Sequence, residues 1–288
     1  MPSGILLLDK PRGVSSNAAL QRVRSLFGRV KAGHVGSLDP LATGMLPICL
    51  GEATKIAGDI LAGRKRYRFS VALGAATATG DSEGDVTQTL PVPQLASAQV
   101  QGVLQRFLGA QTQVPPMYSA LKRDGQPLYK LARAGVEVAR EARAIELFEL
   151  TLLALGPASL ELEALCSKGT YIRVLAADLA AALGTCGHVT SLRRLYVEPF
   201  ANEPMHPLES LRAALPELLP VDWPLQHLPA LQLGVGETRR LLQGQALMVA
   251  VEAAPRVRLY DAGGHFLGFG AVDGHGALQP RRLLQPAG

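Results

Sequence analysis

The chain has 288 residues, 48% of them hydrophobic and 18% charged, which suffices for one or two folded domains and excludes a wholly disordered protein. No stretch approaches the roughly 18 uninterrupted apolar residues of a membrane span, and the N-terminus lacks the pattern of a signal peptide. Three widely spaced cysteines fit neither a disulfide framework nor a metal site. Residues 1–80 carry eleven Lys or Arg against four Asp or Glu, within a net charge of +5. We therefore expect a cytoplasmic protein that binds no metal and meets a polyanion on one side.

The N-terminal part of the chain predicts strands alternating with helices. Apolar residues at helical spacing follow three favoured N-cap residues, Ser15, Ser16 and Asn17, and Gly28 ends this helix. Apolar runs and a clean alternation of apolar with polar residues predict the strands. The expected strands are residues 4–9, 45–50 and 66–73, and the expected helices are residues 18–27 and 53–61.

Beyond residue 73 the pattern becomes irregular. Residues 74–93, rich in Gly, Thr, Asp and Pro, predict a long surface loop. The further expected helices are residues 94–108 and 171–183, the further strands are 143–155, 159–167 and 189–197, and residues 204–224 predict a helix plus a linker. In the last sixty residues, glycines separate short apolar strands, as is typical of a small β-rich module. Because several strands are linked as hairpins, we expect an α+β fold with a mixed, mostly antiparallel sheet flanked by helices.

Asp39 is the first candidate for chemistry, within the segment His34-Val-Gly-Ser-Leu-Asp-Pro-Leu-Ala-Thr-Gly44. The glycines permit tight turns and close approach by another backbone. Pro40 restricts Asp39 to an extended conformation, which aims its short carboxylate in a fixed direction. A rigidly held carboxylate suits covalent or acid–base catalysis. The alternative is that Asp-Pro is an ordinary turn-starting pair.

Partners for such a carboxylate lie elsewhere in the chain. Tyr171 and Arg173 stand between a predicted strand and a predicted helix, and Arg173 is able to pair with Asp39 and keep it ionised. Tyr67 lies on the basic strand 64–68, which allows base stacking beside phosphate contacts, although a core aromatic on a solvated basic strand is the alternative. His34 has no second His at metal-ligand spacing, so we expect a phosphate contact or a hydrogen-bonded loop histidine.

Basic residues are the candidates for binding a polyanion. Arginine forms forked contacts with phosphate oxygens, and an interface led by phosphates weakens as salt rises. The residues that we expect to meet phosphates are Arg64, Lys65, Arg66, Arg68, Arg193, Arg194, Arg281 and Arg282, with Arg256 among the further arginines of a C-terminal docking surface.

Several motifs are missing from the sequence. There is no GxxxxGK[ST] loop for nucleoside triphosphates, no GxGxxG after the first strand, no GxSxG elbow and no HExxH. ATP use, hydride transfer, serine hydrolysis and zinc hydrolysis therefore lose support. Cofactor-free chemistry on a polyanion remains.

The segment 36–55 closely resembles the catalytic signature of the TruB family, the bacterial tRNA pseudouridine-55 synthases. Five further motifs resemble that family in the same order, so the resemblance covers residues 4–200 strongly. These motifs are residues 7–11 (LLDKP), 64–68 (RKRYR), 117–122 (MYSALK), 166–173 (CSKGTYIR) and 192–195 (LRRL). The final module is similar, less specifically, to the family's small RNA-binding PUA-type domain.

The resemblance implies a domain organisation, a substrate and a reaction. It implies a pseudouridine synthase domain over residues 1–228 with a thumb-like RNA-binding loop at about 112–141, and a PUA-like domain over residues 229–288. The implied enzyme flips a uridine out of the T stem-loop of tRNA, detaches uracil from C1′, turns it and rejoins it through C5. No cofactor, membrane or protein partner is expected, and a monomer suffices.

The resemblance also implies a role for each site residue. Asp39 is the catalytic aspartate, and Arg173 holds it. The substrate-binding residues have the remaining roles: Tyr67 stacks on the base, Tyr171 packs against the pocket, Leu192 lines its wall, and His34 holds the RNA. Two positions depart from the family, with Ser37 in place of the common Thr or Ala and Ala78 in place of the usual Asp.

Two other functions stay open from the residues. A non-catalytic tRNA-binding or tRNA-folding protein has the same pocket and differs only in needing no Asp39. A retaining glycoside hydrolase or a base-excising glycosylase also attacks C1′, but it needs a second carboxylate about 5 Å away. Asp81 and Glu52 are the nearby candidates in sequence.

Overall fold

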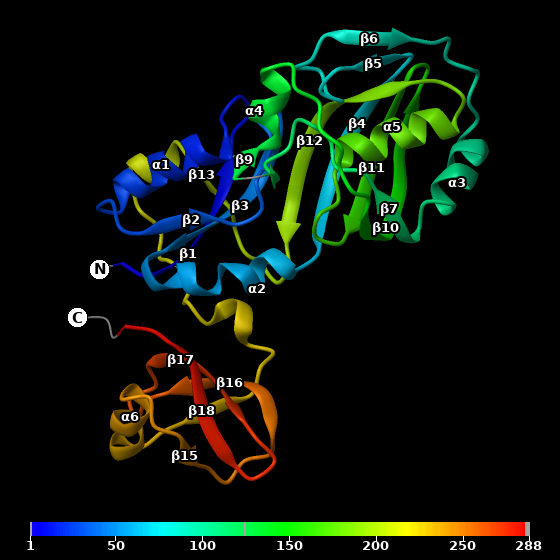
Figure 1. The fold of residues 1–288 in the computed structure, drawn as a ribbon. Coiled ribbons are helices and arrows are strands. Elements are labelled where there is room, and N and C mark those ends of the chain that lie inside the picture. Colours follow the sequence, from blue (N-terminus) through cyan, green and yellow to red (C-terminus); the bar gives the residue numbers. More distant parts are fainter. Residues whose placement is uncertain (1, 124, 286–288) are drawn as a thin grey trace.

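The computed structural model describes residues 2–123 and 125–285. Within these residues, nine strands form a mixed sheet in the order β13-β1-β3-β12-β4-β11-β10-β7, with β2 paired to β3 (Figure 1). The strands are β1 Gly4–Lys10, β2 Ala32–His34, β3 Thr43–Leu50, β4 Lys65–Leu73, β7 Gly109–Gln113, β10 Arg143–Gly156, β11 Ser159–Cys166, β12 Gly187–Val197 and β13 His206–Pro207. Among these pairs β1–β13 and β3–β12 are parallel and the others antiparallel. The predicted α+β class with a mostly antiparallel sheet is confirmed.

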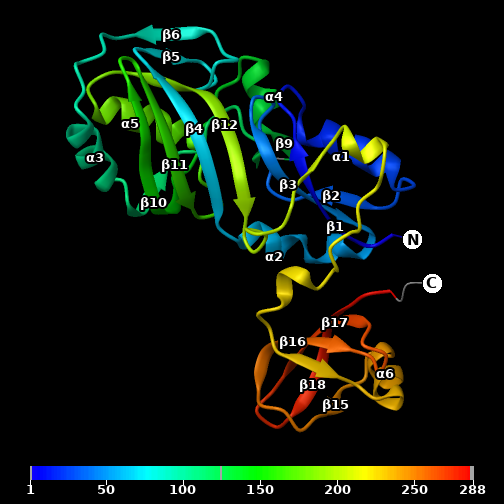
Figure 2. The same cartoon turned by 180° about the vertical axis from the view of Figure 1, so that it is seen from behind.

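The parallel contact between β3 and β12 joins two halves of this sheet. It spans only two residue pairs, Arg193 with Thr43 and Arg194 with Gly44. One half holds β1, β2, β3 and β13, and the other holds β4, β7, β10, β11 and β12. Figures 1 and 2 show the two halves side by side. Helix α5 covers one face of the second half, and Figure 2 shows the opposite face of that half toward the viewer. Residues that lie on both sides of this seam are brought together by it.

Helices cover the sheet where the sequence supplies an apolar stripe. The helices of this domain are α1 Ser16–Leu26, α2 Ala57–Ala62, α3 Ser97–Gln105, α4 Leu128–Arg133 and α5 Ile172–Ala182. Ser15 caps α1, because its side chain accepts a hydrogen bond from the backbone N–H of Ala18 at 3.2 Å. The apolar residues of α5, such as Leu175 and Leu179, enter the main core.

Strand β1 is apolar on both faces because both faces are covered. Leu6 and Leu8 belong to the main core, whereas Ile5 and Leu7 belong to a second cluster beneath α2. A strand buried on two sides shows a continuous apolar run instead of an alternation. The expected strand 4–9 is therefore found, as β1, with both of its faces buried.

The C-terminal residues form a separate small sheet in the order β14-β16-β17-β18-β15. Its strands are β14 Ala230–Gln232, β15 Leu247–Met248, β16 Ala254–Tyr260, β17 Phe266–Val272 and β18 Ala277–Leu283, and α6 is Val235–Leu242. Leu241, Val257 and Leu259 belong to its own hydrophobic core. The expected β-rich C-terminal module is confirmed, and Figure 1 shows it beyond α2 from the main sheet.

Ion pairs and hydrogen bonds attach this module to the segment that precedes β4. Arg256 forms an ion pair with Asp59 of α2, with one contact of 3.0 Å, and its guanidinium lies 3.9 Å from the centre of the Phe269 ring. Arg282 donates a 2.9 Å hydrogen bond to the carbonyl of Lys55. Arg256 and Arg282 thus contact the first domain, and their expected contact with phosphates stays a prediction.

Two segments differ from their predicted structure. Residues 74–93 contain a short hairpin, β5 Ala75–Thr77 with β6 Val86–Thr89, where a loop was expected. Residues 204–224 contain β13 and two short 3-10 turns, Ser210–Arg212 and Trp223–Leu225, where a helix was expected. The prolines spaced along this segment remove backbone hydrogen-bond donors that a helix needs. In the described parts of the chain, no helix is long and apolar enough to cross a membrane.

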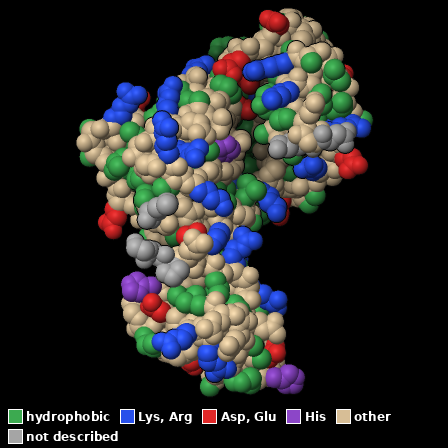
Figure 3. Space-filling view, turned by 60° about the vertical axis from the view of Figure 1, so that its left-hand side comes forward, with side chains coloured by type: hydrophobic (Ala, Val, Ile, Leu, Met, Phe, Trp, Pro, Cys, Tyr) green, Lys and Arg blue, Asp and Glu red, His purple; other side chains and the backbone are tan. Residues whose placement is uncertain are grey.

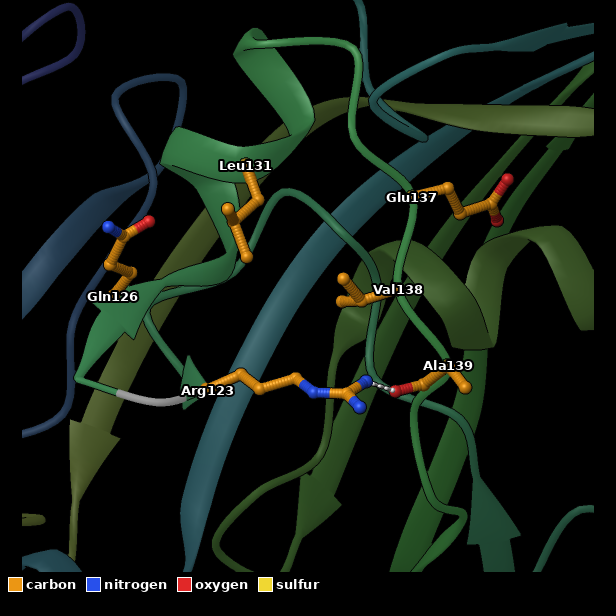
Figure 4. Close-up of a pocket in the computed structure, with 6 residues that line it drawn as sticks. All are labelled: Arg123, Gln126, Leu131, Glu137, Val138 and Ala139. Carbon is orange, nitrogen blue, oxygen red and sulfur yellow. Dashed lines mark hydrogen bonds between the residues drawn. The ribbon is translucent and has the colours of Figure 1, made fainter.

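The segment between β7 and β10 carries a two-stranded hairpin and a short helix. The hairpin is β8 Lys122–Arg123 with β9 Gln126–Pro127, and α4 follows it. Arg123 reaches across an open hollow to donate a 2.9 Å hydrogen bond to the carbonyl of Ala139, which ties the outgoing and returning parts of the segment together (Figure 4). Figure 1 shows α4 beside the seam between the two halves of the sheet.

Candidate active site

A pocket of about 440 Å³ lies at the seam between β3 and β12. The β2–β3 loop lines one side, and β4, β12 and the segment before α5 line the other. All six residues predicted for the site line this pocket: His34, Asp39, Tyr67, Tyr171, Arg173 and Leu192. The segment that carries α4 contributes Ser119, Ala120 and Leu121 to the rim.

The loop that carries Asp39 is held by the preceding turn and helix. Ser16 donates a 2.8 Å hydrogen bond to the carbonyl of Leu38 and accepts a 2.8 Å hydrogen bond from its N–H. The N–H of Gly13 donates to the carbonyl of Pro40 at 2.8 Å. These contacts fix the backbone on both sides of Asp39, so its carboxylate is presented by a rigid turn.

Arg194 also holds this loop, and the role that the sequence predicts for it is wrong. It was expected to meet phosphates, but its side chain is 1% exposed and donates to the carbonyls of Met45 and Gly36, each at 2.7 Å. Gly44 has φ of +97°, and a Cβ there would lie 2.1 Å from the carbonyl oxygen of Arg194. The close approach of the two strands therefore requires a glycine. Leu192 and Arg194 share the inward face of β12, and this alternation is the signal that identifies the arginine as buried.

Arg173 links Asp39 to a second carboxylate behind it. Its Nε lies 2.9 Å from Asp39 Oδ2 and 3.7 Å from Asp81 Oδ2, and its side chain is 4% exposed. The remaining guanidinium nitrogens donate to the carbonyls of Thr79 and, at 2.6 Å, Tyr118. Asp81 also accepts a 2.6 Å hydrogen bond from the Thr79 hydroxyl. Thr79 and Asp81 thus provide the polar contacts of this loop, in which Ala78 departs from the family pattern.

Burial sets the protonation behaviour of the pocket. Burial raises the pKa of Asp39 above its usual range, Arg173 opposes this shift, Asp81 adds to it, and Lys10 opposes it more weakly. The Asp39 side chain is nevertheless 38% exposed, because it opens into the pocket. Burial also raises the pKa of Tyr67, so the phenol is neutral at physiological pH.

His34 lines the same pocket as Asp39 and carries no positive charge at neutral pH. Burial lowers its pKa, and the neighbouring Arg194 lowers it further. Its buried Nδ1 has no hydrogen-bond partner within the described chain. His34 is therefore a neutral imidazole in the wall of the pocket.

The basic strand 64–68 is largely neutralised by the protein itself, unlike the expectation. Lys65 is buried, donates to the carbonyl of Leu61 at 2.6 Å, and burial lowers its pKa to about 8. Arg66 and Arg68 both pair with Glu163, at 3.0 and 3.1 Å. Figure 3 shows Lys and Arg side chains spread over both domains on the face in view.

A second carboxylate is not available inside the pocket. Among the described residues that line it, Asp39 is the sole carboxylate. Asp81 is buried behind Arg173 and does not line the pocket, and Glu52 pairs with Lys55 at 2.6 Å beside the C-terminal module. This arrangement disfavours a retaining glycosidase, which needs two carboxylates on either side of the bond that is cut.

Comparison with known proteins identifies the family. A family model for "TruB family pseudouridylate synthase (N terminal domain)" matches residues 24–172, "tRNA pseudouridylate synthase B C-terminal domain" matches 173–222, and "Pseudouridine synthase II TruB, C-terminal" matches 229–284. The chain is similar to a tRNA pseudouridine synthase B of Chromohalobacter salexigens, with 50% identity over 99% of this chain and 95% of that protein. It is 48% identical to a protein of the same name from Aromatoleum aromaticum, over 98% of this chain and 92% of the relative.

The fold is also found in a solved structure of low sequence similarity. The crystal structure of a Cbf5-Nop10-Gar1 complex contains a chain with a TM-score of 0.71 and 21% identity, covering 98% of this chain and 85% of that one. This likeness concerns the fold alone. Family models cover most of the described residues, and near-full-length relatives are about half identical. The chain therefore belongs to the TruB family of pseudouridylate synthases.

Proposed function

We propose that this protein isomerises a specific uridine in the T loop of tRNA to pseudouridine, and that Asp39 is its catalytic residue. Isomerisation of a tRNA uridine follows from membership of the family and from the names of its relatives. One observation carries the assignment of Asp39: it is the sole carboxylate among the described residues that line the pocket. A non-catalytic binding protein does not need that carboxylate.

The reaction rearranges one nucleotide without adding or removing heavy atoms. The bond between C1′ and N1 breaks, a bond between C1′ and C5 forms, and the proton of C5 leaves while N1 gains one. Such an isomerisation needs neither an oxidant nor ATP. Asp39 acts at the sugar–base junction in its ionised form, and Arg173 stabilises that form and fixes its direction.

The walls of the pocket suit a uracil that has left its stack. We assign Tyr67 to stacking on the base, Leu192 and Tyr171 to its apolar walls, and His34 to holding the RNA, in keeping with the placement of all four around Asp39. Extruding a base costs a few kcal/mol, which contacts with the walls offset. The neutral phenol and imidazole avoid burying a charge against the base.

We further propose a division of labour along the chain. Residues 1–228 form the catalytic domain, residues 112–141 contact RNA as a thumb-like loop, and residues 229–288 dock the tRNA. The protein acts as a monomer in the cytoplasm and requires no protein partner. A separate core and sheet in the C-terminal module support this boundary.

Replacing Asp39 by Asn tests the catalytic assignment. Asn keeps the shape but cannot act as an anion, so the variant should release no tritium from tRNA labelled at C5 of uridine, while its tRNA affinity stays within a few-fold of the unchanged protein. Glu52→Gln is the matched control, because it removes a carboxylate outside the pocket. Turnover by Asp39→Asn above contamination contradicts the assignment, and free uracil in the products indicates a base-excising glycosylase instead.

A further inference from the structure

Gln113 makes an unusual contact with the backbone that enters α5. It is the last residue of β7, and its side chain is buried, with 5% exposure. Its Oε1 accepts a 2.8 Å hydrogen bond from the N–H of Tyr171, and its Nε2 donates a 3.1 Å hydrogen bond to the carbonyl of the same residue. One amide side chain therefore satisfies both polar groups of one backbone residue, 58 positions later in the chain.

Tyr171, the residue to which Gln113 is hydrogen-bonded, is the N-cap of α5. The carbonyl of Tyr171 also accepts from the N–H of Leu175 at 3.1 Å, which opens the helix. Tyr171 and Arg173 project from this first turn into the pocket. Gly169 has φ of +83°, so the incoming loop passes through a glycine just before the turn. A shift of this turn moves both pocket residues relative to Asp39.

The chain that follows Gln113 contacts the same turn a second time. The carbonyl of Tyr118 accepts a 2.6 Å hydrogen bond from Arg173, whose Nε is paired with Asp39. Gln113 and Tyr118 thus both lie at the start of the segment that carries α4, and each is bonded to the first turn of α5. The segment that covers the pocket and the arginine that holds Asp39 are tied to one another.

We propose that Gln113 is a positioning residue for the isomerisation, and that it sets Tyr171 and Arg173 against Asp39 by fixing the first turn of α5. The inference rests on the proposed function of the pocket. Gln113 does not line the pocket itself, so it acts only through the residues that it holds. Its effect therefore falls on the chemical step rather than on tRNA affinity.

Two substitutions test this role. Gln113→Met keeps the length of the side chain and removes both hydrogen bonds, whereas Gln113→Glu keeps the acceptor for the N–H of Tyr171 and turns an oxygen toward its carbonyl. Gln111→Met is the matched control on the same strand, since its side chain makes only one long contact, 3.5 Å to the carbonyl of Arg106. The tRNA is labelled with tritium at C5, and single-turnover rates are measured at saturating protein across pH.

We expect both Gln113 variants to slow the single-turnover rate at least 10-fold while tRNA binding stays within threefold. The acid limb of their pH profiles should move to higher pH, because an arginine held less firmly stabilises ionised Asp39 less well. Gln111→Met should match the unchanged protein in both. A purely structural role lowers the folded fraction but leaves the position of the acid limb unaltered. If Gln113→Met fails to fold, Gln113→Glu decides.

The inference is overturned if folded Gln113 variants keep the rate and the acid limb of the unchanged protein, or if the loss lies only in tRNA binding. Failure of the proposed function looks different. In that case the unchanged protein itself forms no pseudouridine, whereas here it is active and Asp39→Asn is not.

Discussion

The substitution Ser16→Ala tests whether the rigidity of the loop that carries Asp39 matters for the reaction rate. The hydroxyl of Ser16 serves the N–H and the carbonyl of Leu38, both at 2.8 Å in a buried site. Alanine leaves both backbone groups without a partner, and each such group costs about 1–3 kcal/mol. We therefore expect the free energy of unfolding to fall by about 2–6 kcal/mol, against the roughly 5–15 kcal/mol by which domains are stable, and the protein to stay folded at 25 °C.

The same change should loosen Asp39, which follows Leu38 directly. Misplacement of a reacting group by about 1 Å costs on the order of 100-fold in rate, so we expect the single-turnover rate to fall by about 10- to 100-fold. Ser15→Ala provides the control one residue earlier. It removes only the exposed cap of α1, should cost about 1 kcal/mol in unfolding free energy, and should leave the rate unchanged.

Urea unfolding followed by circular dichroism measures the stability of both variants, and tritium release from C5-labelled tRNA measures the rate. The reasoning is refuted if folded Ser16→Ala protein reacts as fast as the unchanged protein. It is refuted equally if Ser15→Ala slows the reaction to the same extent, since the loss then comes from α1 and not from the loop.

Three further predictions concern the pocket and the domain contact. Because burial raises the pKa of Asp39 and the ionised form is required, the single-turnover rate should fall on acidification at a higher pH than an exposed aspartate gives; a rate that stays flat until the protein unfolds contradicts this. Gly44→Ala should destabilise the protein by several kcal/mol, since its Cβ meets the carbonyl of Arg194, and a wild-type midpoint in thermal melting would disprove the close approach. Arg256→Ala should raise the Michaelis constant for tRNA more than it lowers the saturated rate, because it removes the ion pair with Asp59 that holds the C-terminal module; the opposite pattern in steady-state kinetics would assign the module a part in the chemistry.

The parts of the fold that the sequence predicts well are those in which one local pattern decides the structure. Strand β4 alternates, α1 has a cap and an apolar stripe, and Asp39 is marked by its glycines and proline. The hairpin within 74–93 escapes prediction because strands of three or four residues carry too few side chains to establish a period.

The site residues that escape prediction depend on contacts between distant segments. Gln113 lies 58 residues before the backbone that it holds, and nothing in its neighbourhood distinguishes it from Gln111. Arg194 follows Arg193 directly, and its alternation with Leu192 places it on the inward face of β12. The alternation does not show what the buried guanidinium binds there, because its two carbonyl partners, Met45 and Gly36, lie about 150 residues earlier in the chain.

The short contact between β3 and β12 has a consequence for folding during synthesis on the ribosome, because its two strands are made far apart in time. Asp39 is synthesised early, but Arg194, which ties down its loop, follows Gly36 by 158 residues. A nascent chain that ends before β12 therefore carries the catalytic aspartate without the strand that braces it. Contacts of such long separation form slowly compared with local ones. The small C-terminal sheet, by contrast, pairs strands that all lie within residues 230–283, so its contacts are shorter in sequence. The pocket therefore depends for its completion on β12 and not on the C-terminal module.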